Sequence, residues 1–203
     1  MRQMAIKPIL FNTEMVRAIL DGRKECTRRL PRKQIEEKYL EYEEWVCAVA
    51  PPGSTWLSEK EFYEKYPPYQ LGDILYVRET WCGLPVNEAG HFRGHPIYYY
   101  KADGDLRPEG WRGAWRPSIH MPKEAARIWL KVTDVRVERL QDMTDDDAEA
   151  EGCFDYTSTA LGFPDVWDST IKKSDRDRYG WNANPWVWVI EFEQCEKPKE
   201  ERR

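Results

Sequence analysis

Residues Ala126–Leu140 read ARIWLKVTDVRVERL and carry the strongest strand pattern in the sequence. Apolar residues from Ile128 to Val137 are interleaved with charged ones, and alternation with a period of two is typical of a strand with one buried face. The dipeptide Thr133-Asp134 interrupts the apolar series, which predicts a bend or a bulge. We therefore expect the fold to be organised around one long strand in this region.

Shorter elements are predicted on both sides of this strand. Strand composition and turn signals predict strands over residues 6–11, 74–81, 96–101 and 186–192. Helical spacing predicts helices over residues 14–20, 145–151 and 166–173. Asn12 or Thr13 is expected to cap the first helix, and Thr144 with Asp147 the second, which Gly152 ends. Strands outnumber helices, and neither a repeat nor a βαβ alternation is present. The sequence thus predicts an α+β fold, a small mixed β-barrel with short flanking helices and long loop insertions.

The chain has 203 residues, which favours one domain with insertions because domains usually hold about 100–200 residues. Residues 31–68 are rich in Glu, Lys and Tyr and contain Pro51-Pro52-Gly53-Ser54, which indicates an insertion; Gln34 to Trp45 within it is amphipathic. Residues 196–203 are a charged segment that we expect to be a disordered tail. The predicted domain therefore spans residues 1–195.

Composition indicates a globular protein away from membranes. Hydrophobic residues make up 41% and charged residues 33% of the chain, unlike a disordered sequence. No apolar run approaches the roughly 20 residues that cross a bilayer, and the N-terminus lacks the apolar stretch of a secretory signal. We expect a cytoplasmic protein with no membrane partner.

Cysteines and histidines give no metal-binding pattern. The five cysteines are scattered and form no CxxC pair, so we expect free thiols. His91 and His95 have an HxxxH spacing, but Gly and Pro flank them, and a loop does not hold two such side chains on one face as a helix does. We predict no metal and no cofactor.

Net charge and aromatic content limit the partners. The formal charge of −5 argues against a general nucleic-acid coat, because nonspecific affinity depends on many Lys and Arg contacts to phosphate. Ten Trp and eleven Tyr exceed what packing alone needs, and aromatic rings also stack on bases. Most of these rings are expected in the core, and a local basic patch stays compatible with the sequence.

The basic motif GRKECTRR occupies Gly22–Arg29, directly after the first predicted helix. Gly22 stands where a helix commonly ends in a left-handed residue, and Pro31 ends the charged segment that follows. We expect an extended strand here, beginning at the corner that the glycine makes. The predicted functional pocket is built around this motif.

The order of these motifs resembles the ASCH family of the PUA-like superfamily. Within it, the chain resembles the longer proteins encoded by phages and prophages, and the likeness covers nearly the whole chain except Pro31–Pro68 and the tail. The segments that carry it are residues 22–29, 71–81, 115–122, 180–186 and 188–192. The resemblance implies a PUA-like barrel, a phage or prophage origin, and the cytoplasm of a bacterial host as its location.

A small bacterial member of this family is an amidohydrolase that removes the acetyl group from N4-acetylcytidine. Its motif lysine and threonine match Lys24 and Thr27, and its helix glutamate matches Glu151 without a gap. This chain is longer than the small enzyme, and Glu25 and Cys26 replace small or β-branched residues of its motif. The resemblance implies Lys24, Thr27 and Glu151 as catalytic residues.

Amide hydrolysis needs a nucleophile, a base and a proton donor. Thr27 is predicted to be the nucleophile, Lys24 its base and Glu151 the acid or the group that orients water. Strict strand alternation would put Lys24 and Thr27 on opposite faces, so a bend must bring them together. The competing interpretation is an ordinary surface pair beside the last residue of an acidic helix.

Further residues are predicted to bind substrate. Arginines match phosphates and base edges, a glutamate is a rival catalytic carboxylate, and tryptophans stack on bases or serve as packing lids. The predicted residues are Arg28, Arg29, Arg78, Glu79, Trp81 and Trp115.

Two functions remain open from the sequence. The first is an amidohydrolase acting on an N-acylated nucleoside or a related modified base. The second is a noncatalytic module that binds RNA or a nucleotide. The acidic net charge favours a small ligand over long RNA.

Overall fold

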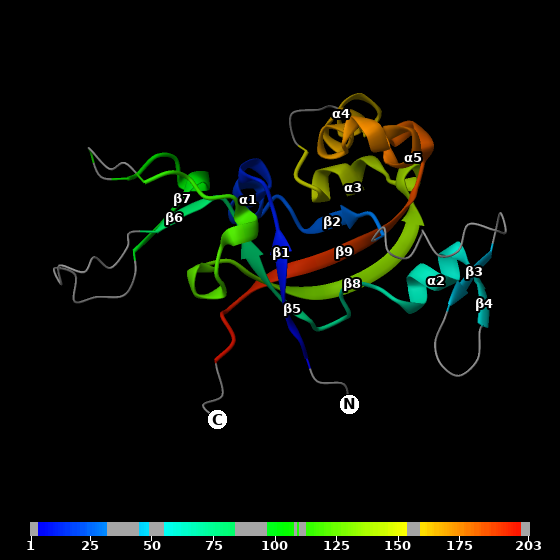
Figure 1. Ribbon diagram of the computed structural model, residues 1–203, viewed down its shortest axis with the longest axis horizontal. Helices are drawn as coiled ribbons and strands as arrows, with labels where there is room; N and C mark the ends of the chain where they lie inside the picture. Colours follow the sequence, from blue (N-terminus) through cyan, green and yellow to red (C-terminus); the bar gives the residue numbers. More distant parts are fainter. Residues whose placement is uncertain are drawn as a thin grey trace. The chain divides into compact units, whose positions relative to one another are not determined.

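A computed structural model of the protein is drawn in Figure 1. It describes residues 4–31, 45–48, 55–83, 97–107, 109, 113–153 and 159–199, with the backbone alone at 45–48, 55–57 and 159–161. The chain divides into two compact units. Unit 1 comprises Met1–Arg23, Gly72–Lys131 and Glu193–Arg203, and unit 2 comprises Lys24–Leu71 and Val132–Phe192.

The described part of unit 1 holds short strands, one α-helix and three 3₁₀-helices. Strand β1 pairs in parallel with β5, β5 pairs antiparallel with β8, and β6 and β7 form a separate antiparallel pair. The elements are β1 (Ile6–Leu10), α1 (Thr13–Leu20), β5 (Ile74–Arg78), β6 (Trp81–Gly83), β7 (Tyr98–Tyr100), η2 (Lys101–Asp103), η3 (Ser118–His120), η4 (Lys123–Ala125) and the first residues of β8 (Trp129–Arg139).

Unit 2 holds most of the helices. Strand β2 pairs antiparallel with β9, and β3 pairs antiparallel with β4. The elements are β2 (Cys26–Arg29), β3 (Trp45–Ala48), β4 (Thr55–Ser58), α2 (Glu59–Lys65), the rest of β8, η5 (Leu140–Asp142), α3 (Asp145–Ala150), α4 (Thr159–Thr170), η6 (Lys173–Asp175), α5 (Arg176–Tyr179), η7 (Trp181–Ala183) and most of β9 (Trp186–Cys195).

The main sheet has five strands in the order β1-β5-β8-β9-β2. Its long strands β8 and β9 pass from one unit into the other. The order ends at β1 and β2, so within the described part of the chain the sheet is open. The predicted α+β class is confirmed, whereas the closed barrel is not.

The predicted strand at 126–140 corresponds to β8, which is the longest strand of the structure. Its buried residues include Leu130 and Val132, while Lys131 between them is exposed, as alternation requires. The strand continues through Thr133 and Asp134, and both are exposed. The alternating pattern therefore located the strand and its buried face.

The predicted single strand over 74–81 is wrong, because β5 ends at Arg78 and β6 begins at Trp81. The backbone N–H of Glu79 is directed at Met121 Sδ, 3.2 Å away, instead of at a neighbouring strand. The buried Glu79 carboxylate is held by Arg127. These contacts take Glu79 out of the strand ladder.

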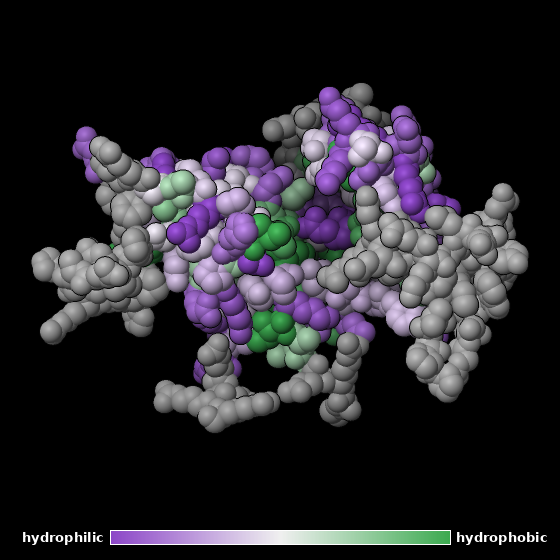
Figure 2. Space-filling view, viewed as in Figure 1, coloured by the Kyte–Doolittle hydropathy of each residue, from purple (hydrophilic) through white to green (hydrophobic). Residues whose placement is uncertain are grey.

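Each unit has its own apolar core. In unit 1, Trp81, Met121 and Trp129 pack with neighbouring residues of β5 and η4. In unit 2, Phe163 and Trp167 of α4 pack with residues of α3 and β9. Hydrophilic residues gather over α4 and α5 in Figure 2, so these helices bury one side and expose the other.

Helix α1 follows its predicted caps. Asn12 is the N-cap and its side chain accepts a hydrogen bond from Met15 N at 2.8 Å. Gly22 adopts φ 71°, a backbone conformation that favours glycine, and it ends the helix. Residue type therefore fixes the turn at Gly22, the first residue of the basic motif.

Part of the predicted insertion packs on the main sheet. Helix α2 begins with a capping box between Ser58 and Glu61. Trp188 of β9 donates its indole N–H to the Tyr63 carbonyl at 3.0 Å, and the two rings meet edge to face. Most of the amphipathic segment predicted over 34–45 lies outside the described residues.

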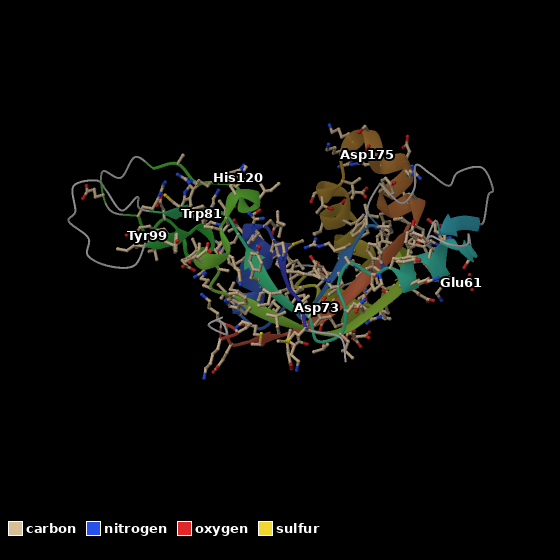
Figure 3. All side chains as sticks on the ribbon, turned by 60° about the horizontal axis from the view of Figure 1, so that its bottom comes forward. Glu61, Asp73, Trp81, Tyr99, His120 and Asp175 are labelled. Carbon is tan, nitrogen blue, oxygen red and sulfur yellow. The ribbon has the colours of Figure 1, made fainter. Side chains whose placement is uncertain are left out.

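Asp73 fixes the start of β5 to β1 and is marked in Figure 3. The carboxylate is buried, accepts from Lys7 Nζ at 2.7 Å and accepts from the Ala5 amide at 3.2 Å. Replacing it leaves both donors without this acceptor.

We predict that Asp73→Ala lowers the free energy of unfolding by about 1–3 kcal/mol, because the partly buried Lys7 ammonium and Ala5 amide lose this acceptor. Glu124→Ala, at an exposed position of unit 1, is the control and should change the free energy of unfolding by less than about 0.5 kcal/mol. Urea denaturation measures both. Equal losses in the two variants would contradict the assigned role of Asp73.

Candidate functional site

The sequence-predicted residues Lys24 and Glu151 meet in unit 2. Lys24 Nζ donates to Glu151 Oε2 at 2.5 Å and to the Glu151 carbonyl at 2.9 Å, although the residues are 127 positions apart. The Lys24 side chain is fully buried and that of Glu151 is 5% exposed. The backbones of the two residues also form an isolated antiparallel bridge. Main-chain and side-chain contacts thus fix this pair together.

Arg28 completes the surroundings of the Glu151 carboxylate. Its backbone N–H donates to Glu151 Oε1 at 2.7 Å, and its guanidinium lies 3.5 Å from the same oxygen. The guanidinium also pairs with Glu138 at 2.8 Å and Asp147 at 3.3 Å. Arg28 Nε is buried and has no hydrogen-bond partner in the described part of the chain. Each oxygen of Glu151 thus has its own donors.

A more exposed arginine joins the same cluster. Arg136 of β8 pairs with Glu138 and with Asp147, at 3.3 and 3.4 Å. It also pairs with Glu191 of β9. We call Lys24, Arg28, Arg136 and the four carboxylates Glu138, Asp147, Glu151 and Glu191 the charge cluster. Opposite charges alternate in it, so each buried ion has a counter-ion.

Helix α3 positions the acidic part of this cluster. Thr144 caps the helix, and Asp147 closes a capping box with the Thr144 amide and hydroxyl. Glu151 is the C-cap residue, and Gly152 follows with φ 87°. Asp147 and Glu151 are four positions apart on a helix and therefore point to the same side.

Burial and charge change the pKa values in the cluster. Burial, together with the Glu151 carboxylate, raises the pKa of the Cys26 thiol to about 12. Burial alone would lower the pKa of Arg28, but the neighbouring carboxylates, Glu151 first, outweigh it and raise the pKa. Cys26 is therefore a neutral thiol and Arg28 a permanent cation in this site.

Thr27 lies on the other face of β2. It is 1% exposed and is paired with Ile190 of β9, whereas Cys26 and Arg28 face the charge cluster. No hydrogen bond joins the Thr27 hydroxyl to Lys24 among the residues described. Thr27 is thus adjacent in sequence to the charge cluster but separated from it by strand alternation.

The chain changes its pairing partner between Lys24 and Cys26. The Glu25 amide donates to Ala150 O at 2.8 Å, on the α3 side, and the Glu25 carbonyl accepts from Phe192 N at 2.9 Å, on the β9 side. Lys24 therefore lies outside the regular alternation of β2. This is the location where the sequence predicted a bend.

Arg29 is another predicted substrate-binding residue, and strand alternation puts it on the same face of β2 as Thr27. Burial lowers the pKa of Arg29, and the Glu151 carboxylate opposes that change. Its strand partner is Trp188. The second face of β2 thus carries a hydroxyl and a cation beside buried aromatic residues.

The other predicted binding residues, Arg78, Glu79, Trp81 and Trp115, belong to unit 1. Arg78 does not pair with Glu79. Its Nε donates to the Met121 carbonyl at 2.7 Å, and its Nη2 donates to the Ile119 carbonyl. Arg78 therefore supports the loop before β8 through backbone contacts.

Glu79 has a structural partner within unit 1. Its carboxylate accepts two hydrogen bonds from Arg127, at 2.9 and 3.1 Å, and Arg127 also pairs with Asp103 at 2.7 Å. Burial raises the pKa of Glu79, although Arg127 opposes the change. A carboxylate held by two donors of one arginine is well suited to fixing η2.

The two predicted tryptophans differ in access. Trp81 is 5% exposed, packs edge to face on Tyr98 and has a buried indole N–H without a partner in the described residues. Trp115 is half-buried, with the Arg107 guanidinium 4.5 Å from its ring centre. Figure 3 marks Trp81 and, on the same strand pair, Tyr99. Burial leaves Trp81 unsuited to stacking on a ligand, whereas Trp115 retains exposed ring surface.

His120, the histidine that the structure describes, is not part of the candidate site. His120 is exposed on η3 and is marked in Figure 3. His91 and His95, the predicted HxxxH pair, lie outside the described residues.

Four members of the charge cluster were not predicted from the sequence as site residues. Arg136 and Glu138 were interpreted only as charged residues of the long strand, Glu191 only as part of the closing strand, and Asp147 only as a helix cap. The signal for Arg136 and Glu138 was an Arg-x-Glu spacing, which places both side chains on one face of β8. Local spacing identifies Asp147 as a helix cap, but it does not show that the same carboxylate pairs with Arg28 of β2 and Arg136 of β8.

Comparison of the chain with protein-family models, with curated proteins and with solved structures gave no match. The resemblance to the ASCH family therefore stays a prediction. Within the described residues, no helix combines the length and apolar character needed to cross a membrane.

Asp147 should make stability depend on pH. Burial would raise its pKa, but the Thr144 amide and hydroxyl and the Arg28 guanidinium outweigh burial and lower it. A carboxyl group with a lowered pKa stabilises the fold fully above its unfolded pKa of about 3.9, and this contribution is lost as pH falls through the folded pKa.

We predict that Asp147→Asn lowers the free energy of unfolding by about 1–2 kcal/mol near neutral pH and that the difference from wild type shrinks below about pH 4. Chemical denaturation across this range measures it. Asp146→Asn, at an exposed neighbouring position, is the control and should show a smaller difference. A difference for Asp147→Asn that stays constant on acidification would contradict the assigned ion pairs.

Proposed function

We propose that the protein is an amidohydrolase that acts on an N-acylated nucleoside or a related modified base such as N4-acetylcytidine. The observation that carries the proposal is the buried contact of Lys24 Nζ with Glu151 Oε2 at 2.5 Å. A buried acid and a buried base in contact can exchange a proton without involving bulk water. Amide hydrolysis needs groups that accept and return protons, and such a pair can do both.

Proton exchange within the pair would prepare both groups for acylation. Transfer from Lys24 to Glu151 gives a neutral amine and a neutral carboxylic acid. Thr27 Oγ then attacks the acyl carbon while its proton passes to Lys24, and Glu151 protonates the leaving nitrogen. The acyl group is left on Thr27, and the free nucleoside departs.

Deacylation reverses the two proton movements. The Glu151 carboxylate takes a proton from water as that water attacks the acyl carbon. The Lys24 ammonium returns a proton to Thr27 Oγ as the ester bond breaks. The products are the nucleoside and a carboxylic acid, and the pair is again a neutral amine and a neutral carboxylic acid. Transfer of the proton from Glu151 back to Lys24 restores the ion pair.

The proposal requires the Thr27 hydroxyl to come within reach of the Lys24 amine. Lys24 lies before β2, where the chain exchanges α3 for β9 as its partner. A change in backbone direction at Glu25 is the means by which Lys24 would reach the Thr27 side of the strand. Arg29, on the Thr27 face, is a candidate for holding the substrate.

The resemblance and its implications belong to the same proposal. We propose a PUA-like fold of the ASCH family for the five-stranded sheet and its helices. We also propose a phage or prophage origin and the cytoplasm of a bacterial host as the place where the nucleoside is met. The noncatalytic alternative, binding of RNA or a nucleotide, shares the fold but needs no proton transfer.

We predict that the purified protein releases cytidine from N4-acetylcytidine, and that Lys24→Ala, Thr27→Ala and Glu151→Gln each slow turnover by about a hundredfold or more. Chromatography of the nucleosides measures turnover. Glu149→Gln is the matched control, because Glu149 is exposed on the same helix. Circular dichroism checks that each variant is folded.

Two outcomes would contradict the proposal. One is a folded wild-type protein that leaves a panel of N4-acylated cytidines unchanged. The other is a turnover that survives all three substitutions. Saturable binding of the same nucleosides without turnover would identify the noncatalytic module instead.

A further inference from the structure

A second candidate site lies wholly within unit 1, in a cleft of about 400 Å³. Ligand sites commonly measure roughly 300–1,000 Å³, so this cleft has room for a small ligand. Its residues come from the start of α1, from η2 and the loop after it, and from Trp115. They are Thr13, Glu14, Arg17, Lys101, Gly104, Asp105 and Trp115.

Trp115 provides the aromatic wall of the cleft. The Arg107 guanidinium lies 4.5 Å from its ring centre, and Arg107 is itself held by Asp105 through two contacts of 2.6 Å. Arg107 therefore covers one face of the ring and fixes its orientation. The ring surface that lines the cleft is thus preorganised for stacking against a flat group.

The cleft also carries an uncompensated positive charge. Arg17 pairs with Glu14 at 3.1 Å, and Arg107 pairs with Asp105. Lys101 is exposed and forms no ion pair with any residue that the structure describes. The charges within each of these two ion pairs cancel, so the Lys101 ammonium is the group that can receive an anion.

The start of α1 adds to this preference. Thr13 and Glu14 are the first residues of an eight-residue helix, where backbone N–H groups and the helix dipole favour negative charge. Arg17 Nε is bound to the Ala102 carbonyl at 2.9 Å, which ties α1 to η2. The Thr13 hydroxyl and the carboxylates of Glu14 and Asp105 supply acceptors for hydroxyl or amino groups.

From these features we infer that the unit 1 cleft binds a nucleoside 5′-phosphate, with the base on Trp115 and the phosphate at Lys101. A flat aromatic group, an anion and hydrogen-bond donors occur together in this ligand class, and each has a counterpart in the cleft. The nucleotide is either free or part of a single strand. This inference does not rest on the amidohydrolase proposal, since Lys24, Thr27 and Glu151 all belong to unit 2.

The test is calorimetric titration of the full-length protein with 5′-AMP. We predict that Trp115→Ala and Lys101→Gln each weaken binding by about tenfold, since loss of one stacked base or one charge contact commonly has that effect. Trp186→Ala is the matched control, because Trp186 is also half-buried with an arginine over its ring, Arg139 at 4.2 Å. Lys172→Gln, at an exposed position in unit 2, controls for the lost charge.

Three further ligands separate the contributions of the base, the phosphate and a longer strand to the affinity. Adenosine and ribose 5-phosphate, each lacking one half of 5′-AMP, should bind at least about fivefold more weakly than 5′-AMP. A tetra-adenylate that binds more tightly than 5′-AMP, with strong salt dependence, identifies single-stranded nucleic acid as the source. Equal or weaker binding identifies the free nucleotide.

The inference is overturned if 5′-AMP does not bind, if inorganic phosphate binds as tightly, or if Trp115→Ala leaves the affinity unchanged. Trp186→Ala and Lys172→Gln should keep full affinity for 5′-AMP, because both positions belong to unit 2. Loss of binding in either variant, with Trp115→Ala unchanged, would assign the ligand to unit 2 instead.

Discussion

The contact between the Lys24 ammonium and the Glu151 carboxylate is the interaction on which unit 2 depends. Removing two ions from water costs several kcal/mol for each, and the cost is recovered only where geometry and further hydrogen bonds are good. Here Glu151 Oε2 takes the ammonium and Oε1 takes the Arg28 amide, so both oxygens are satisfied. The contact joins the segment before β2 to the end of α3, and the rest of the charge cluster surrounds it. The same buried contact therefore fixes the segment before β2 to the end of α3 and shields the acid–base pair from water.

Local patterns in the sequence located most elements of the fold. Alternation predicted β8, and the capping residues Asn12 and Thr144 predicted the starts of α1 and α3. Gly22 and Gly152 predicted helix ends, and both have positive φ. These features depend on residues within a few positions of one another, which a sequence displays directly. The meeting of Lys24 with Glu151 followed from the family resemblance, since no local spacing connects residues 127 positions apart.

Features set by contacts between distant residues were missed. The sequence predicted one strand over 74–81, but the chain leaves β5 at Glu79 because Arg127 holds that carboxylate. It left base stacking and packing open for both Trp81 and Trp115, and it is tertiary packing that buries the first and leaves the second half-exposed in a cleft. Closure of a sheet into a barrel also depends on pairing between distant segments. In the described residues the five strands have an open order, in place of the predicted barrel. Each miss is a case where tertiary contacts outweighed a local preference.

A double-mutant cycle on Lys24 and Glu151 tests most directly whether the pair acts as one unit. Free energies of unfolding are measured for wild type, Lys24→Met, Glu151→Gln and the double variant. Breaking a buried pair leaves one uncompensated ion and costs about 3–5 kcal/mol, whereas removing both charges costs less than the sum of the single changes. We predict a coupling energy of about 2 kcal/mol or more. Single costs that add within about 0.5 kcal/mol would contradict the buried pair as the centre of the fold and of the proposed chemistry.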